Sequence, residues 1–308
     1  MTQISNVSPA GLKLVSAPVA PRWRRGGMLT MSVPAVVWYA IFTIGPLLAM
    51  FYIALLKWRG LIAPASFTGF SNFTALWHDP VFWTAAKNSL IQLVIVLTIM
   101  LPLAFMLGYY VSLKPPGHRT LRVILFTPAL VSLSAKSMIF VAVFAPNGML
   151  NGLLTTLGLQ TWTQPWLANV HTALITVIAV DLWSGIGYTA ILFAARLSAV
   201  SPDLYEAAQI DGASHWRRMW GITYPIIKDY FGVLLMLQFL WVLFSSAGSV
   251  LLLTNGGPGN SSTTLSFLMY DKAFSQSQVG YSQAVGVVLF AVGVVGMVLI
   301  RRVFKPTH

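Results

Sequence analysis

Long apolar runs separated by short polar segments dominate the pattern of this chain. A membrane-spanning helix needs about 20 predominantly apolar residues, and the chain contains six runs of that kind. The predicted spans are 28–56, 86–113, 123–145, 172–197, 230–254 and 282–300. Internal prolines such as Pro46, Pro102 and Pro128 do not exclude helices here, because neighbouring helices re-satisfy the backbone groups that proline frees. The pattern predicts an all-α membrane protein with six transmembrane helices.

Composition agrees with this class. Of the 308 residues, 56% are hydrophobic and 8% are charged, whereas soluble domains carry roughly 25% charged residues. Cysteine is absent, which excludes disulfides and thiolate metal sites. The first span is too long and too late in the chain for a cleaved signal peptide. We therefore expect one transmembrane domain over 28–304, a loose N-terminal tail over 1–27 and a short C-terminal tail over 305–308.

The basic residues predict the orientation of the spans. With six spans both termini lie on one side, and that side holds fourteen Lys and Arg residues against four on the other. The fourteen are Lys13, Arg22, Arg24, Arg25, Lys114, Arg119, Arg122, Arg196, Arg217, Arg218, Lys228, Arg301, Arg302 and Lys305; the four are Lys57, Arg59, Lys87 and Lys272. By the positive-inside rule both termini and the loop at about 198–229 are cytoplasmic. The same bias explains the net charge of +12, so no nucleic-acid partner is expected.

The sequence contains no catalytic signature. It has no phosphate-binding loop of the Walker A type, no zinc-protease helix motif and no nucleophile elbow. Its five histidines are scattered over loops and the C-terminal tail. We therefore expect no catalytic residue, no metal site and no cofactor bound by this chain. Transport, or a scaffold role, is favoured over an enzyme.

A polar segment between the fourth and fifth spans carries much of the scarce charge. Ser201, Pro202 and Asp203 are typical of a helix start, with an N-cap, a proline at the first position and an acid near the positive end of the dipole. Glu206, Ala207 and Ala208 follow in the next turn. Small alanine side chains leave a flat surface that a partner backbone can approach. The segment therefore begins with a helix suited to close contact.

The second half of this segment predicts a second short helix. Asp211 and Gly212 interrupt the first helix, since glycine tolerates backbone angles that other residues avoid, and Asp211 is expected to cap the next one. That helix carries Trp216, Met219 and Trp220 beside Arg217 and Arg218, and Pro225 is expected to end it. An apolar face and a basic face result. On spacing alone, an amphipathic loop lying on the membrane surface stays an equal alternative.

The segment resembles the coupling motif of the permease subunits of ABC importers. That motif reads Glu-Ala-Ala, then Gly, then nine residues, then Ile-x-Leu-Pro, and here Glu206, Ala207, Ala208, Gly212, Ile222 and Pro225 match it. Tyr224 replaces the leucine, and Asp229 stands where a further proline is often found. Residues 67–90 and 254–274 are similar to outer segments of the carbohydrate-uptake branch, with Gly-x-x-Asn, Asp-Pro-x-Phe and Thr-x-Gly-Gly-Pro. The resemblance covers about residues 30–300.

The resemblance implies a mechanism and a set of partners. In this family the loop after the fourth span sits in a cleft on an ATP-hydrolysing subunit, where Glu206 would make charged contacts and Ala207, Ala208 and Gly212 would permit close approach. The implied partners are a second permease in a heterodimer, two ATP-binding cassette subunits that carry ATP and Mg, an extracytoplasmic substrate-binding protein and membrane lipid. The implied location is the bacterial inner membrane, and the implied cargo is a sugar or sugar-like solute. An ion-driven secondary carrier that works without an ATPase is the alternative.

Intramembrane polar residues suggest where cargo would pass. Asp181 lies in the fourth span and Lys136 in the third; they form a structural bridge, or one of them contacts cargo, and the sequence does not decide between these. By resemblance, Gly185 and Tyr188 fall on the cargo side of the fourth span, where Tyr188 offers a stacking face and a hydroxyl. The matching positions on the fifth span are Phe239, Leu243 and Ser246, with Gln238 and Trp241 as further candidates. Helix packing through small residues is the structural alternative.

Overall fold

The computed structural model describes residues 25–60 and 63–304, with side chains from residue 32 onward. Most of the predicted tail at 1–27 and all of the tail at 305–308 lie outside the described residues. Two compact units, 1–48 and 49–308, divide the chain. The first described helices are α1 (Arg25–Tyr39), a π-helical turn (Ala40–Ile44) and α2 (Gly45–Ile53). Described helix thus begins at Arg25, three residues before the predicted start of the first span.

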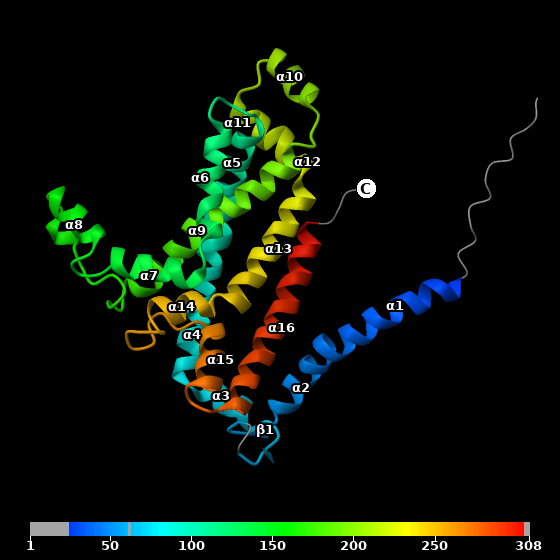
Figure 1. Ribbon diagram of the computed structural model, residues 1–308, viewed down its shortest axis with the longest axis vertical. Coiled ribbons are helices and arrows are strands. Elements are labelled where there is room, and N and C mark those ends of the chain that lie inside the picture. Colours follow the sequence, from blue (N-terminus) through cyan, green and yellow to red (C-terminus); the bar gives the residue numbers. More distant parts are fainter. Residues whose placement is uncertain (1–24, 61–62, 305–308) are drawn as a thin grey trace, which may run out of the picture. The chain divides into compact units, whose positions relative to one another are not determined.

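The second unit is a bundle of helices with short connections (Figure 1). Two-residue strands β1 (Leu56–Lys57) and β2 (Ser66–Phe67) pair antiparallel. The helices of its first half are α3 (Ser71–His78), α4 (Pro80–Ile95), a π-helical turn (Val96–Met100), α5 (Leu101–Ser112), α6 (His118–Leu130), α7 (Leu133–Val143), α8 (Met149–Thr156) and a 3-10 turn (Gln160–Trp162). Those of its second half are α9 (Ala173–Leu197), α10 (Pro202–Ile210), α11 (His215–Arg218), a π-helical turn (Met219–Thr223), α12 (Tyr224–Ile226), α13 (Lys228–Ser245), α14 (Ala247–Leu253), α15 (Leu265–Phe274) and α16 (Val279–Val303).

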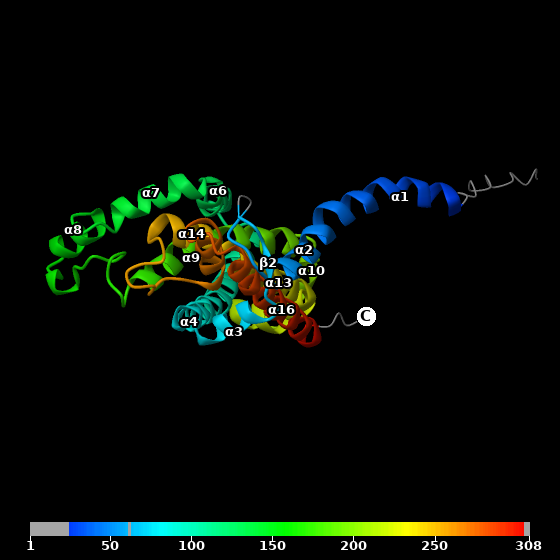
Figure 2. The ribbon, with the colours of Figure 1, turned by 90° about the horizontal axis from the view of Figure 1, so that it is seen from below.

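Five described helices are long and apolar enough to cross a membrane, or six if one bent pair counts as a single span. The five are Ser32–Ile53, Pro80–Ser112, Ala173–Leu197, Lys228–Ser245 and Val279–Val303. The predicted third span is the bent pair: α6 and α7 meet at an angle of 97°. Ser132 causes the new helix start, since its side chain accepts a hydrogen bond from the Ala135 amide at 3.3 Å. Figure 2 shows α7 and α8 directed away from α13 and α16.

The predicted fifth span is also shorter than expected. Helix α13 ends at Ser245, and residues 247–253 form the separate helix α14. Ser246 at the junction is buried and donates a hydrogen bond to the Val242 carbonyl at 2.8 Å. The apolar run 230–254 therefore contains two helices, because apolarity alone does not distinguish a straight helix from two joined ones.

Proline explains the three π-helical turns. Each turn is followed by a helix whose second residue is proline, namely Pro46, Pro102 and Pro225. Proline lacks the N–H and its ring clashes with the carbonyl four residues earlier. Widening the preceding turn relieves that clash without ending the helix. The expectation that Pro46, Pro102 and Pro128 leave the chain helical is confirmed at all three, since Pro128 lies inside α6.

Close helix approaches depend on glycine. A methyl group added at Gly187 of α9 would collide with the Leu125 carbonyl of α6. One at Gly108 of α5 would collide with Phe193 and Ala190 of α9. Small residues at such crossings let backbones pack tightly, as is common in membrane bundles. Helix α9 is therefore the central element against which α5 and α6 pack.

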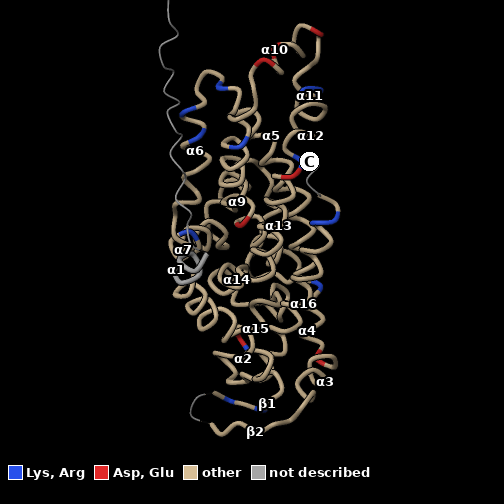
Figure 3. The backbone as a smooth tube through the Cα atoms, turned by 90° about the vertical axis from the view of Figure 1, so that its right-hand side faces the viewer, with Lys and Arg blue, Asp and Glu red and all other residues tan. Residues whose placement is uncertain are grey.

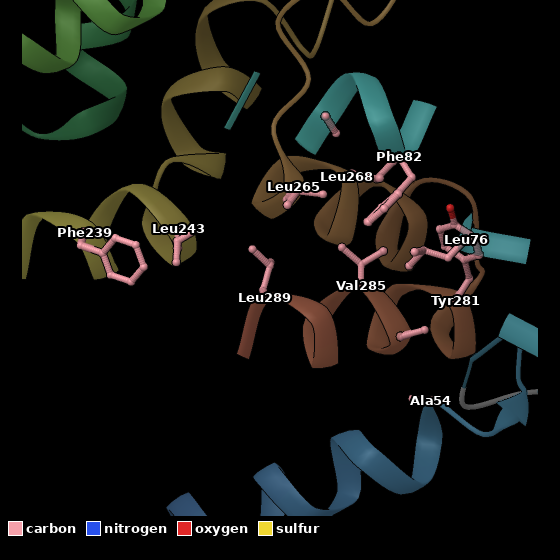
Figure 4. Close-up of a cluster of buried hydrophobic side chains, with 12 residues drawn as sticks. Ala54, Leu76, Phe82, Phe239, Leu243, Leu265, Leu268, Tyr281, Val285 and Leu289 are labelled. Atoms are coloured by element: carbon pink, nitrogen blue, oxygen red, sulfur yellow. The ribbon is translucent and has the colours of Figure 1, made fainter. Parts of the chain in front are cut away.

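A core cluster joins the outer helices. Figure 4 shows Leu265 and Leu268 of α15 between Phe82 of α4 and Val285 of α16. Asp79 caps α4 by accepting the Val81 amide at 2.8 Å, and it also accepts the Tyr281 hydroxyl at 2.8 Å. The Asp-Pro-x-Phe motif thus has a structural role: Asp79 caps the start of α4, and Phe82 packs in the core cluster.

Candidate functional site

The segment from Ser201 to Ile226 folds as two short helices, as predicted. Ser201 is the N-cap of α10, since its side chain accepts the Asp203 amide at 3.3 Å. Gly212 has φ +73°, which a residue with a side chain rarely adopts, so the turn between α10 and α11 requires glycine. Figure 3 shows acidic residues at α10 and basic residues near α6 and α11, with long uncharged stretches along α9 and α13.

Two local expectations for this segment are wrong. Ser214, not Asp211, caps α11, because its side chain accepts the Arg217 amide at 3.3 Å; Asp211 is the C-cap residue of α10. Pro225 does not end the helix, which continues through the π-helical turn to Ile226. The widened turn accommodates the proline, as it does at Pro46 and Pro102.

The predicted basic face is also corrected. Arg217 is exposed, but Arg218 is buried at 7% exposure beside the buried Met219. The guanidinium of Arg218 donates to the Gln209 side-chain carbonyl at 3.4 Å and lies 3.2 Å from Nδ1 of His215. Arg218 therefore ties α10 to α11 and does not extend a solvated basic stripe.

Helix α10 presents an open surface. Glu206, Ala207 and Asp211 are exposed, and Ile210 is 87% exposed. Ala208 faces inward at 9% exposure. Ile210 is therefore a large apolar side chain that the fold of this chain leaves almost uncovered. Of the two predicted alanines, only Ala207 belongs to this surface; Ile222 is half-buried in the following π-helical turn.

A second candidate site lies within the bundle. A cavity of about 410 Å³ is bounded by α6, α7, α9 and α13, with Met100 closing one side. Its polar lining consists of Lys136, Asp181, Ser184, Tyr188, Gln238 and Trp241. Gly185 also lines it, and Met100 packs so closely on Gly185 that a methyl group there would collide. Cavities of this size with a few convergent polar groups are typical ligand sites.

Lys136 and Asp181 lie near this cavity but do not form an ion pair within 4 Å. Lys136 Nζ donates to Ser184 Oγ at 2.9 Å. The two carboxylate oxygens of Asp181 accept from Ser249 at 2.7 Å and from Gln92 at 3.2 Å. Asp181 is 1% exposed and satisfied by protein donors, whereas Lys136 keeps two N–H groups beyond its bond to Ser184.

The cargo-side residues predicted for the fifth span divide into two groups. Gln238 and Trp241 line the cavity together with Leu237. Phe239 and Leu243 instead belong to the core cluster with α16 (Figure 4), and Ser246 is buried against Ser266 at 2.9 Å. The positions that the resemblance assigns to the cargo side of the fifth span therefore pack against other helices and do not line the cavity. Tyr188, at 45% exposure, also lines the cavity.

Sequence reasoning missed Gln92 and Ser249. Each is a buried polar residue in an apolar helix, and each completes the hydrogen bonding of Asp181. The available signal was an amide and a hydroxyl inside long apolar runs, where polar side chains require partners. Their pairing with Asp181 across 89 and 68 residues depends on helix packing that no local pattern encodes.

Helices of this length and apolarity are those of an integral membrane protein. Residues 100–306 match the family described as binding-protein-dependent transport system inner membrane component, and the chain belongs to that family.

Named relatives agree with the family. The diacetylchitobiose uptake system permease protein NgcF of Streptomyces coelicolor is 33% identical over 295 residues, which cover 90% of this chain and 81% of the relative. The lactose transport system permease protein LacF of Rhizobium radiobacter is 31% identical over 250 residues, which cover 78% and 81%. A bacterial alginate ABC transporter, solved in complex with an alginate pentasaccharide-bound periplasmic protein, contains a chain of similar fold, with a TM-score of 0.79 at 22% identity over 92% of this chain and 96% of that one.

Proposed function

We propose that this chain is a permease subunit of an ATP-driven importer for a sugar or sugar-like solute. It would form half of the translocation path, with a second permease as the other half in a heterodimer. Two ATP-binding cassette subunits would bind ATP and Mg, and an extracytoplasmic binding protein would deliver the cargo. The names of the relatives support a carbohydrate cargo, since NgcF and LacF are both named for sugars.

The exposed surface of α10 is the observation that carries this proposal. Ile210, Ala207 and Glu206 are exposed on a helix whose spacing matches the coupling motif. We propose that this surface lies in the cytoplasm, with both termini on the same side, as the distribution of Lys and Arg supports. There it would dock on an ATPase subunit. Closure of two ATPases on ATP would draw two such loops together and switch the spans between two states.

The cavity next to Lys136 would be this chain's share of the cargo path. Lys136 and Gln238 offer hydrogen-bond donors, and Tyr188 and Trp241 offer aromatic faces on which a sugar ring can stack. Asp181 would hold its neighbours through Ser249 and Gln92 rather than contact the cargo. A charge inside the membrane that faces a cavity is usually functional, which supports a role for Lys136.

Reconstitution of the purified assembly with its co-expressed neighbours tests the proposal. We expect ATP hydrolysis that the binding protein stimulates, and uptake that requires ATP. The double change Glu206→Ala with Gly212→Asp should abolish stimulated hydrolysis and uptake while the subunits remain assembled. Arg217→Ala, which alters an exposed residue of the same loop outside the α10 surface, is the matched control. Uptake that continues without ATP and follows an ion gradient would instead establish the secondary-carrier alternative.

A further inference from the structure

Two cavities share a wall at the end of α5. The first is a groove of about 810 Å³ along α5, lined by apolar and aromatic side chains and closed at one end by His215, Trp216 and Met219. The second, of about 410 Å³, is polar and lies between the ends of α5 and α9 and the helices α10 and α11. Leu113 and His215 line both. An apolar groove and a polar cavity therefore lie next to each other at this end of α5.

The apolar groove has the length of one membrane leaflet. Its lining on α5 runs from Leu103 to Leu113, which is about 15 Å at 1.5 Å per residue. Half of a bilayer core of about 30 Å is the same length. The α5 lining carries no charge, and the first charged residue, Lys114, follows directly after it. The groove thus ends where a span would reach the headgroups.

The polar cavity carries an excess of positive charge. Lys114 and Arg218 line it, against the single carboxylate of Glu206. Arg218 is 93% buried, and its Nε–H has no hydrogen-bond partner among the described residues. Its contact with Nδ1 of His215 is a hydrogen bond only if that nitrogen carries no proton. An anionic oxygen acceptor in this cavity would satisfy donors that the protein leaves without a counter-charge.

We propose that an anionic phospholipid binds here, with one acyl chain in the groove along α5 and its phosphate in the cavity lined by Lys114 and Arg218. The phosphate supplies the acceptor oxygens and the negative charge, and the chain fills the apolar space. Basic pockets at the cytoplasmic ends of membrane helices favour such headgroups. Glu206 and Tyr205 of α10 also line this cavity. The bound lipid would therefore contact α10 on the side that faces the bundle.

Lipid retention tests this inference independently of transport. The purified assembly is equilibrated in nanodiscs that contain phosphatidylglycerol and phosphatidylcholine, and the lipids that stay bound after transfer to detergent are counted by native mass spectrometry. We expect retained phosphatidylglycerol in excess of phosphatidylcholine. Lys114→Asn should reduce that retention about fivefold, the effect of one basic residue near an anionic lipid. Asparagine tolerates the left-handed backbone of Lys114, whose φ is +53°.

Matched variants show whether a loss of lipid retention comes from this site, from the loss of any positive charge or from misfolding. Arg119→Gln removes an exposed positive charge that lines neither cavity, and it should leave retention unchanged. Leu103→Trp fills the groove without a change of charge and should lower retention, whereas Val94→Trp, at an exposed position outside the groove, should not. Equal retention of the two lipids, equal losses with Lys114→Asn and Arg119→Gln, or no effect of Leu103→Trp would each overturn the inference.

Discussion

Two polar segments of this chain have opposite surroundings. In the Thr-x-Gly-Gly-Pro segment, Thr254–Phe267, every residue from Ser262 to Phe267 is buried. Asn88 Nδ2 donates to the carbonyls of Ser261 and Thr263, both at 2.9 Å, and Ser89 accepts the Leu265 amide at 2.8 Å. In α10 the polar and apolar side chains are mostly exposed, and Ile210 contacts little of its own chain. The polar groups of the first segment are bonded within this chain, whereas the side chains of the second are left exposed.

The difference shows how a motif should be interpreted. Both segments match the same family of transport components, so the match does not say which residues meet a partner. Burial separates the two cases: polar groups that are hydrogen-bonded inside the chain stabilise its own fold, whereas exposed side chains remain available to a partner. The Thr-x-Gly-Gly-Pro segment therefore connects α14, α15 and α4 within this chain, whereas the α10 surface is the one that we propose as an interface.

The largest expected effect lies in the Thr-x-Gly-Gly-Pro segment. Asn88→Ala would leave the buried carbonyls of Ser261 and Thr263 without a donor and should destabilise the fold by about 3 kcal/mol. Thermal unfolding of the purified assembly measures this as a lowered Tm. Lys87→Ala, at an exposed position of the same helix, is the control and should leave Tm unchanged. A stable Asn88→Ala protein would remove the contrast between the two segments.

A smaller effect is expected at Gly212, in the turn between α10 and α11. Gly212→Ala places a side chain on a residue in the left-handed region, at φ +73°. That conformation raises the free energy of the folded state by about 1–2 kcal/mol. Nothing lies within 4 Å of the added methyl group, so the cost is one of backbone conformation and not of packing. Coupled ATP hydrolysis should fall while Tm changes little, because the turn is local. Gly221→Ala, with the same open space at a glycine without positive φ, should be near neutral.

Ser201→Ala is the third change and should lower the stability of α10 by about 1 kcal/mol. It removes the side chain that accepts the Asp203 amide at the start of α10. Fraying of the first turn should be detectable as faster amide hydrogen exchange in residues 203–206 than in the unmodified protein. Ser198→Ala tests a serine outside the helix and should leave exchange in α10 unaltered. Unchanged exchange in both variants would show that the cap is not what holds this surface.

Much of the fold follows from local pattern, and the rest does not. The apolar runs predicted the long helices, Ser201 predicted the start of α10, and the Asp211-Gly212 turn was expected from glycine. The bend at Ser132 and the break at Ser246 were missed, since both lie in runs apolar enough to read as one helix. The burial of Arg218 and the pairing of Asp181 with Gln92 and Ser249 depend on contacts between distant helices.

The cavity shows the same limit. Resemblance to a family assigned Gly185 and Tyr188 to the cargo side of the fourth span, and both residues line the cavity. Phe239 and Leu243 were assigned to the same side of the fifth span, but they pack against α16. Neighbouring positions Gln238 and Trp241 face the cavity instead. In a helix of 3.6 residues per turn, successive side chains point about 100° apart. An error of one residue in matching two distantly related sequences therefore assigns a side chain to the wrong face.

A single cysteine at Ile210 provides the most direct measurement of whether α10 is a docking surface. The chain has no native cysteine, so Ile210→Cys can be labelled selectively by a water-soluble maleimide. Labelling should be fast in the chain purified alone and at least tenfold slower in the assembly with its ATPase subunits. Phe70→Cys, exposed at the other end of the bundle, should label equally in both. Equal labelling of Ile210→Cys with and without the ATPase subunits would contradict the docking of α10.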